Sequence, residues 1–174
     1  MKVITALEDI DNNNRISVFL AGGITDCPDW QSEVIAYLRH YEINNKLDLV
    51  VYNPRRKFFD IYKDDPQEQI KWEYNAINKA DIFSMYFCGS KSVQPICLYE
   101  LGVKIGESKY SYDISTEDIN NRLIVSVENE YSRRTDVIVQ AFYACPRLAV
   151  MVNASPISHA KLIIDRYNKL VKGL

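Results

Sequence analysis

The chain has 174 residues, of which 25% are charged, with 21 Lys and Arg against 23 Asp and Glu. This length suits one globular domain with a core of its own, and the balanced charge offers no basic surface for a long nucleic acid. No apolar stretch approaches the roughly 20 residues that span a bilayer, and the early acidic residues argue against a signal peptide. We therefore expect one domain over residues 1–174, with 1–14 as a peripheral N-terminal segment and no nucleic-acid or membrane partner.

The cysteines and histidines do not form a metal-binding pattern. No C-x-x-C pair is present, and the chain has only two histidines, His40 and His159, besides Cys27, Cys88, Cys97 and Cys145. This pattern matches neither a zinc site nor a disulfide framework. We expect a reduced, cytoplasmic protein without metal or cofactor, and both histidines on the surfaces of helices.

Five short apolar runs predict five strands, at residues 16–21, 47–52, 82–87, 122–127 and 148–152. The runs are continuous rather than alternating in polarity, which is typical of a parallel sheet that is covered on both faces. Turn-forming residues follow these short runs and separate each predicted strand from the next element of the chain.

Helices are expected between these strands. Asp29 can cap the first helix, Pro66 suits the first turn of the second, and Pro95 opens the third. Two more follow, at 135–143 and after the capping candidates Ser155 or Ser158. In the second helix, the spacing predicts an apolar stripe of Ile70, Tyr74 and Ile77.

This alternation predicts an α/β fold, a single flavodoxin-like doubly wound domain with a five-stranded parallel sheet in the order 2-1-3-4-5 and helices on both faces. Ligands in such folds bind beyond the carboxyl ends of the strands. The loops at 22–29, 53–66 and 88–95 are therefore the candidate binding loops.

The first two loops contain residue types that suit ligand binding. Gly22 and Gly23 follow the first strand without the spacing of a dinucleotide fingerprint, so they serve either a tight turn or a close backbone approach to a ligand. After the second strand come Asn53, Arg55 and Arg56, whose guanidinium groups suit carboxylate or phosphate recognition, unless the loop is simply solvated.

Three acidic residues lie near the expected sheet edge. Glu73 shares one side of its helix with Trp72 and either faces a cleft or reaches solvent. Glu100 is close to the buried side of the third helix, where neighbouring tyrosines could hold it in a partly apolar cleft. Asp81, which precedes the third strand, either serves a ligand or satisfies backbone donors.

Four blocks in order, VFLAGGITDCPDWQ, NPRR, QIKWEYNAINKAD and PICLYELG, resemble the nucleoside 2-deoxyribosyltransferase-like family over about residues 16–110. The resemblance implies a flavodoxin-like fold and chemistry at the N-glycosidic bond of deoxynucleosides. It implies that Glu100 is the nucleophile and that Glu73 binds the nucleobase and passes it a proton. It also implies a homo-oligomer. We expect the substrate contacts to come from Gly22, Gly23, Asp29, Trp30, Asn53, Arg55, Arg56, Trp72, Asp81, Gln94 and Tyr99.

One departure from the family leaves the reaction open. The better-known transferases carry a sugar-binding Asp shortly before the nucleophile, whereas this chain reads SKSVQPI there, with Gln94 as the nearest polar residue. The leading hypothesis is transfer of 2-deoxyribose between nucleobases. The alternatives are a hydrolase of nucleoside monophosphates that uses Arg55 or Arg56, and a catalytically silent nucleotide-binding module. Tyr74, Tyr86 and Tyr99 are predicted to lie beside the site.

Overall fold

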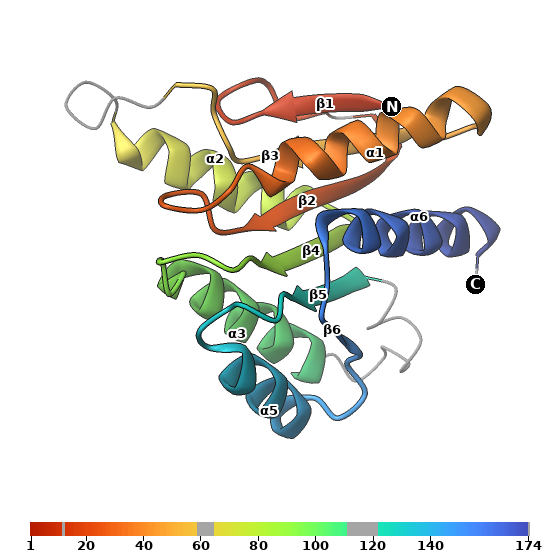
Figure 1. The fold of residues 1–174 in the computed structure, drawn as a ribbon. Helices are drawn as coiled ribbons and strands as arrows, with labels where there is room; N and C mark the ends of the chain where they lie inside the picture. The colour runs from red at the N-terminus through yellow and green to blue at the C-terminus, as the bar shows by residue number, and fades with distance from the viewer. Residues whose placement is uncertain (12, 59–64, 111–121, 174) are drawn as a thin grey trace.

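The computed structural model describes residues 1–11, 13–58, 65–110 and 122–173 (Figure 1). Within these ranges, six strands form one parallel sheet in the order β1-β3-β2-β4-β5-β6. The strands are β1 (Lys2–Thr5), β2 (Ile16–Gly22), β3 (Leu49–Asn53), β4 (Ile82–Phe87), β5 (Leu123–Val127) and β6 (Val150–Val152). The helices are α1 (Trp30–Asn44), α2 (Pro66–Lys79), α3 (Pro95–Tyr110), α5 (Arg134–Ala144) and α6 (Pro156–Lys172).

The predicted α/β doubly wound fold is confirmed, and the five predicted strands appear in the predicted order as β3-β2-β4-β5-β6. The described residues form six strands rather than the predicted five, because β1 lies inside the segment 1–14 that is expected to be peripheral. It pairs in parallel with β3, with Lys2 opposite Val50 and Thr5 opposite Asn53. A four-residue edge strand that is only partly buried lacks the continuous apolar run that marks the central strands.

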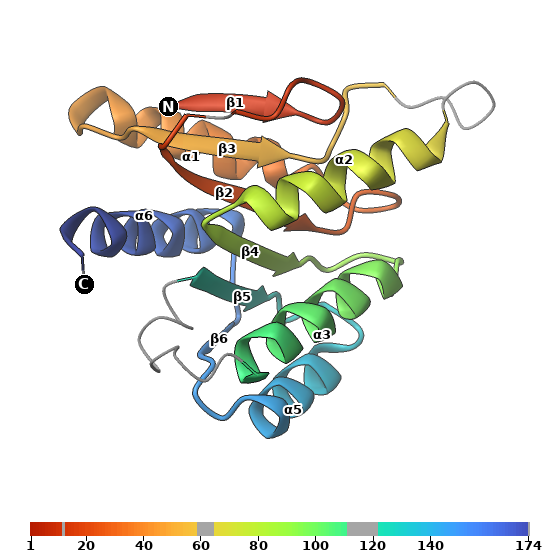
Figure 2. The same ribbon diagram turned by 180° about the vertical axis from the view of Figure 1, so that it is seen from behind.

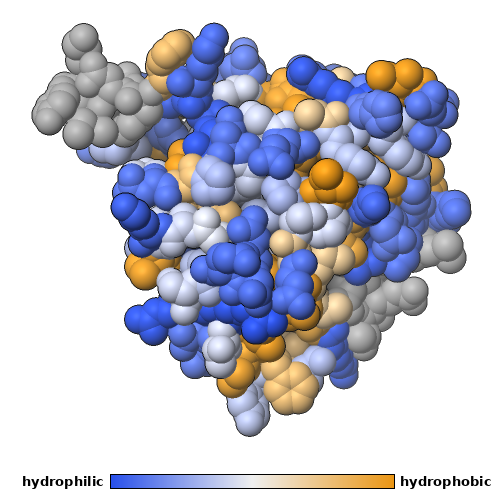
Figure 3. All heavy atoms as spheres, viewed as in Figure 1, coloured by the Kyte–Doolittle hydropathy of each residue, from blue (hydrophilic) through white to orange (hydrophobic). Residues whose placement is uncertain are grey.

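Helices cover both faces of the sheet. One face packs against α1 and α6, through residues such as Trp30, Leu38 and Ile163. The other packs against α2, α3 and α5, through residues such as Trp72 and Leu101, and Figures 1 and 2 show these two layers from opposite sides. Seen from the α1 and α6 side, the surface is mostly hydrophilic with scattered apolar side chains (Figure 3). No helix in the described ranges has the length and apolar character needed to cross a membrane.

Local signals place the helix starts as expected. The Asp29 side chain accepts a hydrogen bond from the Ser32 backbone N–H, and Pro66 occupies the first turn of α2. Ser155 caps α6 in a reciprocal capping box with Ser158. These caps determine where α1, α2 and α6 begin relative to the strand ends.

The predicted apolar stripe on α2 is wrong. The buried side of this helix carries Trp72 and Ala76, whereas Ile70 and Tyr74 are 62% and 67% exposed. Ile77 packs only partly buried against the same core. Trp72 and Ala76 are four residues apart, so they share one face as well as Ile70 and Tyr74 do, and only the packing of the sheet selects between the two faces.

His159 lies in the core rather than on the surface, contrary to expectation. It is fully buried on α6, where Nε2 lies 2.7 Å from Ser84 Oγ of β4 and Nδ1 lies 2.8 Å from Ser126 Oγ of β5. Both serine hydroxyls can rotate to complement either tautomer of a neutral ring. Burial lowers the pKa of His159 from 6.5 to about 3, so the ring stays neutral at physiological pH and joins α6 to two strands.

We predict that His159 makes the fold sensitive to acid. The unfolded chain takes up a proton on this residue below pH 6.5, whereas the folded chain does so only near pH 3. The stability that it contributes is therefore present above pH 6.5 and is lost as the pH falls toward 3, by up to about 1.4 kcal/mol per pH unit. Urea unfolding of the wild type and of His159→Asn between pH 7 and 4 measures the difference in slope. The matched control, His40→Asn on the exposed side of α1, should keep the wild-type slope; an unchanged slope in His159→Asn would contradict the prediction.

Candidate active site

A cavity of about 410 Å³ opens at the carboxyl ends of β2, β3 and β4. This is the sheet edge at which a doubly wound fold is expected to bind ligands. The loop after each of these strands contributes to its wall, and the first turns of α2 and α3 close its sides. The lining residues comprise Phe19, Ala21, Gly22, Gly23, Ile24, Thr25, Pro54, Arg56, Pro66, Gln69, Ile70, Glu73, Ser92, Gln94, Pro95, Ile96, Cys97 and Glu100.

Two carboxyl groups line this cavity, Glu73 from α2 and Glu100 from α3. Burial, and secondly the nearby negative charge of Glu73, raise the pKa of Glu100 to about 7. Burial also raises the pKa of Glu73, although a 2.8 Å hydrogen bond from Gln69 Nε2 and the positive charge of Arg56 oppose that rise. The two groups therefore differ in environment but share one partly desolvated space, which favours a state with a single negative charge on the pair.

The glycine turn after β2 is packed too tightly for larger side chains. A Cβ atom on Gly22, whose φ is +154°, would lie 2.4 Å from the Tyr86 carbonyl oxygen and 2.5 Å from the Trp30 ring. A Cβ on Gly23 would lie 2.4 Å from Cys27 Sγ and 2.7 Å from the Gln94 side chain. Both glycines also line the cavity, so this tightly packed turn is itself part of the cavity wall.

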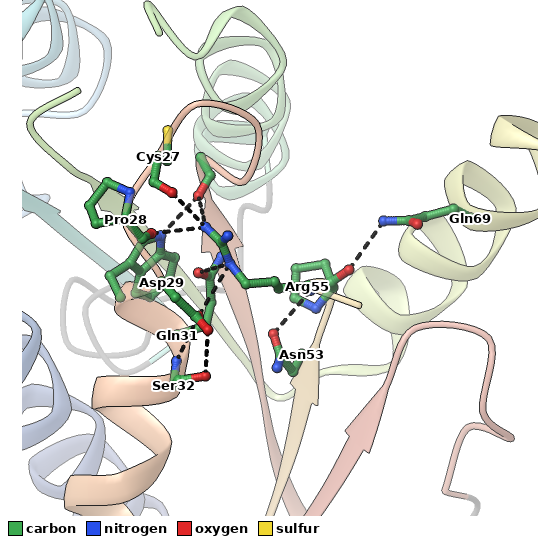
Figure 4. Close-up of polar contacts among 11 residues, drawn as sticks. Cys27, Pro28, Asp29, Gln31, Ser32, Asn53, Arg55 and Gln69 are labelled. Carbon is green, nitrogen blue, oxygen red and sulfur yellow. Dashed lines mark hydrogen bonds and ion pairs between the residues drawn. The ribbon is translucent and has the colours of Figure 1, made fainter. Parts of the chain in front are cut away.

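Arg55 is part of the frame of the site rather than of its lining (Figure 4). Its guanidinium donates hydrogen bonds to Gln31 Oε1 at 2.8 Å and to the carbonyl oxygens of Gly23, Cys27 and Pro28 at 3.3, 3.4 and 2.9 Å. An ion pair with Asp29 at 3.3 Å adds to these contacts. The side chain thus joins the loop after β3 to the whole β2–α1 loop.

Gln94 holds the same turn from the other side. It is 3% exposed and has a positive φ of 48°, which is uncommon for a residue other than glycine. Its Oε1 accepts the Gly23 backbone N–H at 3.2 Å, and its Nε2 donates to the Cys88 carbonyl oxygen at 2.8 Å. Although Gln94 lines the cavity, its amide is therefore engaged with the backbone of two loops.

Several other predicted contacts support the site from outside the cavity lining. Trp30 is fully buried beneath the turn, where Nε1 donates to the Gly23 carbonyl oxygen at 3.1 Å. Trp72 lies in the core and donates to the Glu8 carbonyl oxygen at 2.7 Å. Asn53 accepts the Arg55 backbone N–H at 3.0 Å. Tyr99 is 70% exposed on α3 and does not line the cavity.

Asp81 is not brought to this site. It precedes β4 and therefore lies at the amino end of the strand, opposite the cavity, where its Oδ2 accepts hydrogen bonds from the backbone N–H and the hydroxyl of Ser17, both at 2.8 Å. There it lines a separate polar cavity of about 270 Å³. Of the predicted neighbouring tyrosines, Tyr86 is fully buried and donates its hydroxyl to Glu128, and Tyr74 is exposed on α2.

Sequence reasoning missed several residues that shape the site. Gln31 is fully buried and accepts the hydrogen bond from Arg55. Ile70 and Ile96 form apolar walls of the cavity. All three residues lie near the starts of helices that follow strand ends, and this position is the only signal in the sequence that could have indicated them. Residue type alone does not distinguish such side chains from ordinary surface or core residues.

Comparison with known protein families now adds to this geometry. A family model described as nucleoside 2-deoxyribosyltransferase like matches residues 15–116. The chain belongs to this nucleoside 2-deoxyribosyltransferase-like family. The matched segment contains every residue that lines the larger cavity, including Glu73 and Glu100. No curated protein matches the chain.

We predict that the contacts of Arg55 with the β2–α1 loop require the planar guanidinium group and not only a positive charge. Arg55→Lys should lower the free energy of unfolding by about 2 kcal/mol, because an ammonium group cannot reach the same set of carbonyl and carboxylate oxygens. Urea unfolding measures this loss. The control, Arg133→Lys, changes an exposed arginine paired with Asp136 and should stay within about 0.5 kcal/mol of the wild type. Equal stabilities for the two variants would refute the role given to Arg55.

Proposed function

We propose that this protein transfers 2-deoxyribose between nucleobases by double displacement, through a glycosyl ester on Glu100. The observation that supports the proposal is the presence of Glu73 and Glu100 in the lining of one cavity, within the segment that matches the family. Its substrates would be a deoxynucleoside or deoxynucleotide and a free nucleobase. The chemistry needs no metal or other cofactor, because carboxyl groups perform each step.

In the first step, the Glu100 carboxylate attacks the anomeric carbon while the bond from that carbon to the base nitrogen breaks. The departing base takes a proton from Glu73, since an anionic purine or pyrimidine leaves poorly. In the second step, a nitrogen of another base attacks the anomeric carbon of the glycosyl ester while the bond from that carbon to the Glu100 oxygen breaks. The incoming base gives its proton to Glu73, and the Glu100 carboxylate is free again. This is the logic of a retaining glycosidase, with a nucleobase in place of water.

The ionisation of the two carboxyl groups is coupled. The negative charge of Glu73 is one cause of the raised pKa of Glu100. When Glu73 holds a proton, that cause disappears, so protonation of the acid favours ionisation of the nucleophile. The state with protonated Glu73 and ionised Glu100 is the one that the reaction requires.

The cavity also suits a nucleoside in size and lining. Its volume of about 410 Å³ falls within the range of about 300–1,000 Å³ that is usual for small-molecule sites. Ile70, Ile96 and Phe19 supply apolar surface for a planar base, and the two carboxyl groups supply polar contacts. The proposed reaction requires the anomeric carbon of the sugar to lie next to Glu100 and the base nitrogen to lie next to Glu73.

One observation favours the alternative of a hydrolase that acts on nucleoside monophosphates. Arg56 lines the cavity, where its positive charge reaches Glu73. Arg55, in contrast, is held by the β2–α1 loop. If a phosphate group binds, Arg56 is therefore the arginine that would contact it, and water would replace the second base.

The proposed function includes a homo-oligomer. Helices α2 and α3 expose apolar side chains beside the cavity, among them Tyr74, Ile96 and Tyr99 at 67%, 65% and 70%. A second copy of the chain would cover these side chains and shield the site from water. Sedimentation velocity should show an assembly that Tyr99→Glu weakens, whereas a wild-type monomer at micromolar concentration would contradict this part of the proposal.

We predict that the two carboxyl groups can be separated by the choice of leaving base. Glu73→Gln should lower exchange between deoxyinosine and adenine by about 100-fold or more. It should act almost as well as the wild type on 7-methyl-2-deoxyguanosine, whose cationic base leaves without a proton. Glu100→Gln should lose both reactions, because it lacks the nucleophile. Chromatography of the bases and nucleosides measures each rate.

The matched controls for this experiment are Glu68→Gln on α2 and Glu107→Gln on α3, which change exposed carboxyl groups on the same helices. Both should keep wild-type rates. Release of free base without exchange, dependent on Glu100, would favour the hydrolase instead. Normal exchange by Glu100→Gln would refute both enzyme mechanisms, and binding without any cleavage would leave the silent module.

We predict that the rate with the 7-methylated substrate rises with pH through about 7, because Glu100 must lose its proton to attack and burial raises its pKa to about that value. In Glu73→Gln, the negative charge that contributes to this rise is absent, so the midpoint should move to lower pH. Initial rates from pH 5 to 9, corrected for uncatalysed hydrolysis, test this. A midpoint that stays in place or moves upward in Glu73→Gln would contradict the coupling.

A further inference from the structure

Two free thiols lie beside residues that form the cavity wall. Cys27 lies in the β2–α1 loop, with Sγ packed on Gly23 and 3.3 Å from Ser90 Oγ. Cys88 follows β4, and its Sγ lies 3.6 Å from Gln94 Nε2, which is itself 3.5 Å from the same Ser90 Oγ. The two sulfur atoms thus border one small polar cluster, which Ser90 and Gln94 form between them.

We propose that Cys27 and Cys88 form an intramolecular disulfide when the protein is exposed to a hydroperoxide, and that this bond deforms the cavity wall. The proposal assigns a modification site to residues that the transferase chemistry does not use. The disulfide itself is independent of the proposed function, whereas its effect on activity rests on that function.

The burial of the four cysteines determines the order of events. Cys27 is partly exposed, whereas Cys88, Cys97 and Cys145 are buried. The oxidant therefore reaches Cys27 first and converts its thiol to a sulfenic acid, while the hydroperoxide is reduced to an alcohol or to water. The Cys88 sulfur then attacks the Cys27 sulfur, and the hydroxyl group leaves with the Cys88 proton as water. Burial raises the pKa of Cys88 to about 12, so this second step is the slower one.

The same packing selects Cys88 over the other buried thiols as the partner. Cys27 packs against the core cluster between the sheet and helices α1 and α6, which contains Cys88. Cys97 and Cys145 belong to the cluster on the opposite face of the sheet. Cys27 therefore shares its packing layer with Cys88 and not with Cys97 or Cys145.

The consequence for the cavity follows from Gln94. Its amide joins the Cys88 carbonyl oxygen to the Gly23 backbone N–H, and both Gly23 and Gln94 line the cavity. Formation of the disulfide draws the two loops together and disturbs this amide bridge. Oxidation therefore changes the part of the cavity wall that Gly23 and Gln94 form, and reduction restores it.

The test is to treat the reduced 174-residue chain with hydrogen peroxide, digest it without reductant and identify cross-linked peptides by mass spectrometry. We expect a Cys27–Cys88 peptide pair that dithiothreitol separates. Cys27→Ser should abolish the cross-link, Cys88→Ser should leave a dimedone-reactive sulfenic acid on Cys27, and the control Cys145→Ser should cross-link like the wild type. No cross-link, a bond to Cys97, or a bond between two chains would overturn the proposal.

A second measurement follows the effect on the cavity. Peroxide should abolish most of the deoxyribose exchange of the wild type, with recovery in dithiothreitol, while Cys27→Ser should lose much less activity under the same treatment. If the reduced protein shows no exchange, the proposed function fails. The mass-spectrometric search for the Cys27–Cys88 peptide pair still tests whether the disulfide forms. If the cross-link forms and exchange is unaffected, the deformation of the cavity is refuted.

Discussion

The structure of the site depends on how the peptide groups of Gly23 are satisfied. The carbonyl oxygen accepts hydrogen bonds from Trp30 Nε1 and from Arg55, and the N–H donates to the side chain of Gln94. These three partners come from α1, from the loop after β3 and from the loop after β4. A buried peptide group left without partners would cost about 1–3 kcal/mol, so this single turn couples three loops that are far apart in the sequence. The absence of a Cβ atom at Gly22 and Gly23 is what permits the approach.

The coupled loops determine where the two carboxyl groups lie. The loop that carries Gln94 leads directly into α3 and Glu100, and the loop that carries Arg55 leads toward α2 and Glu73. With both helices directed into one cavity, the carboxyl groups are partly removed from water, and their pKa values rise. The side chains that hold the loops therefore also orient the two helices. In this way they keep the two carboxyl groups in the cavity, partly removed from water. The Cys27 and Cys88 thiols border the same frame, which explains why a change there would reach the cavity.

The apolar runs predicted the central strands, because a strand buried on both faces must be apolar along its whole length. That signal failed for β1, which is short and lies at the edge. The burial of His159 could not be predicted from the sequence either. The two serines whose hydroxyl groups pair with the buried imidazole come from β4 and β5, far from α6 in the sequence. Within the site, Glu73 and Glu100 both line one cavity, and their roles there stay a proposal. Asp81 does not join them because it precedes its strand, and so lies at the opposite end of the sheet.

Periodicity, caps and short motifs were enough to predict the order of strands and helices, the edge of the sheet that holds the cavity, the family resemblance and the two candidate carboxyl groups. Which polar side chains face the cavity and which support it depends instead on contacts between segments that are far apart in the sequence. Arg55 and Arg56 are adjacent in the sequence and have the same side chain, yet one holds a loop and the other lines the cavity. That difference arises from the backbone path and from partners such as Gln31 and Asp29, which the sequence around the arginines does not contain.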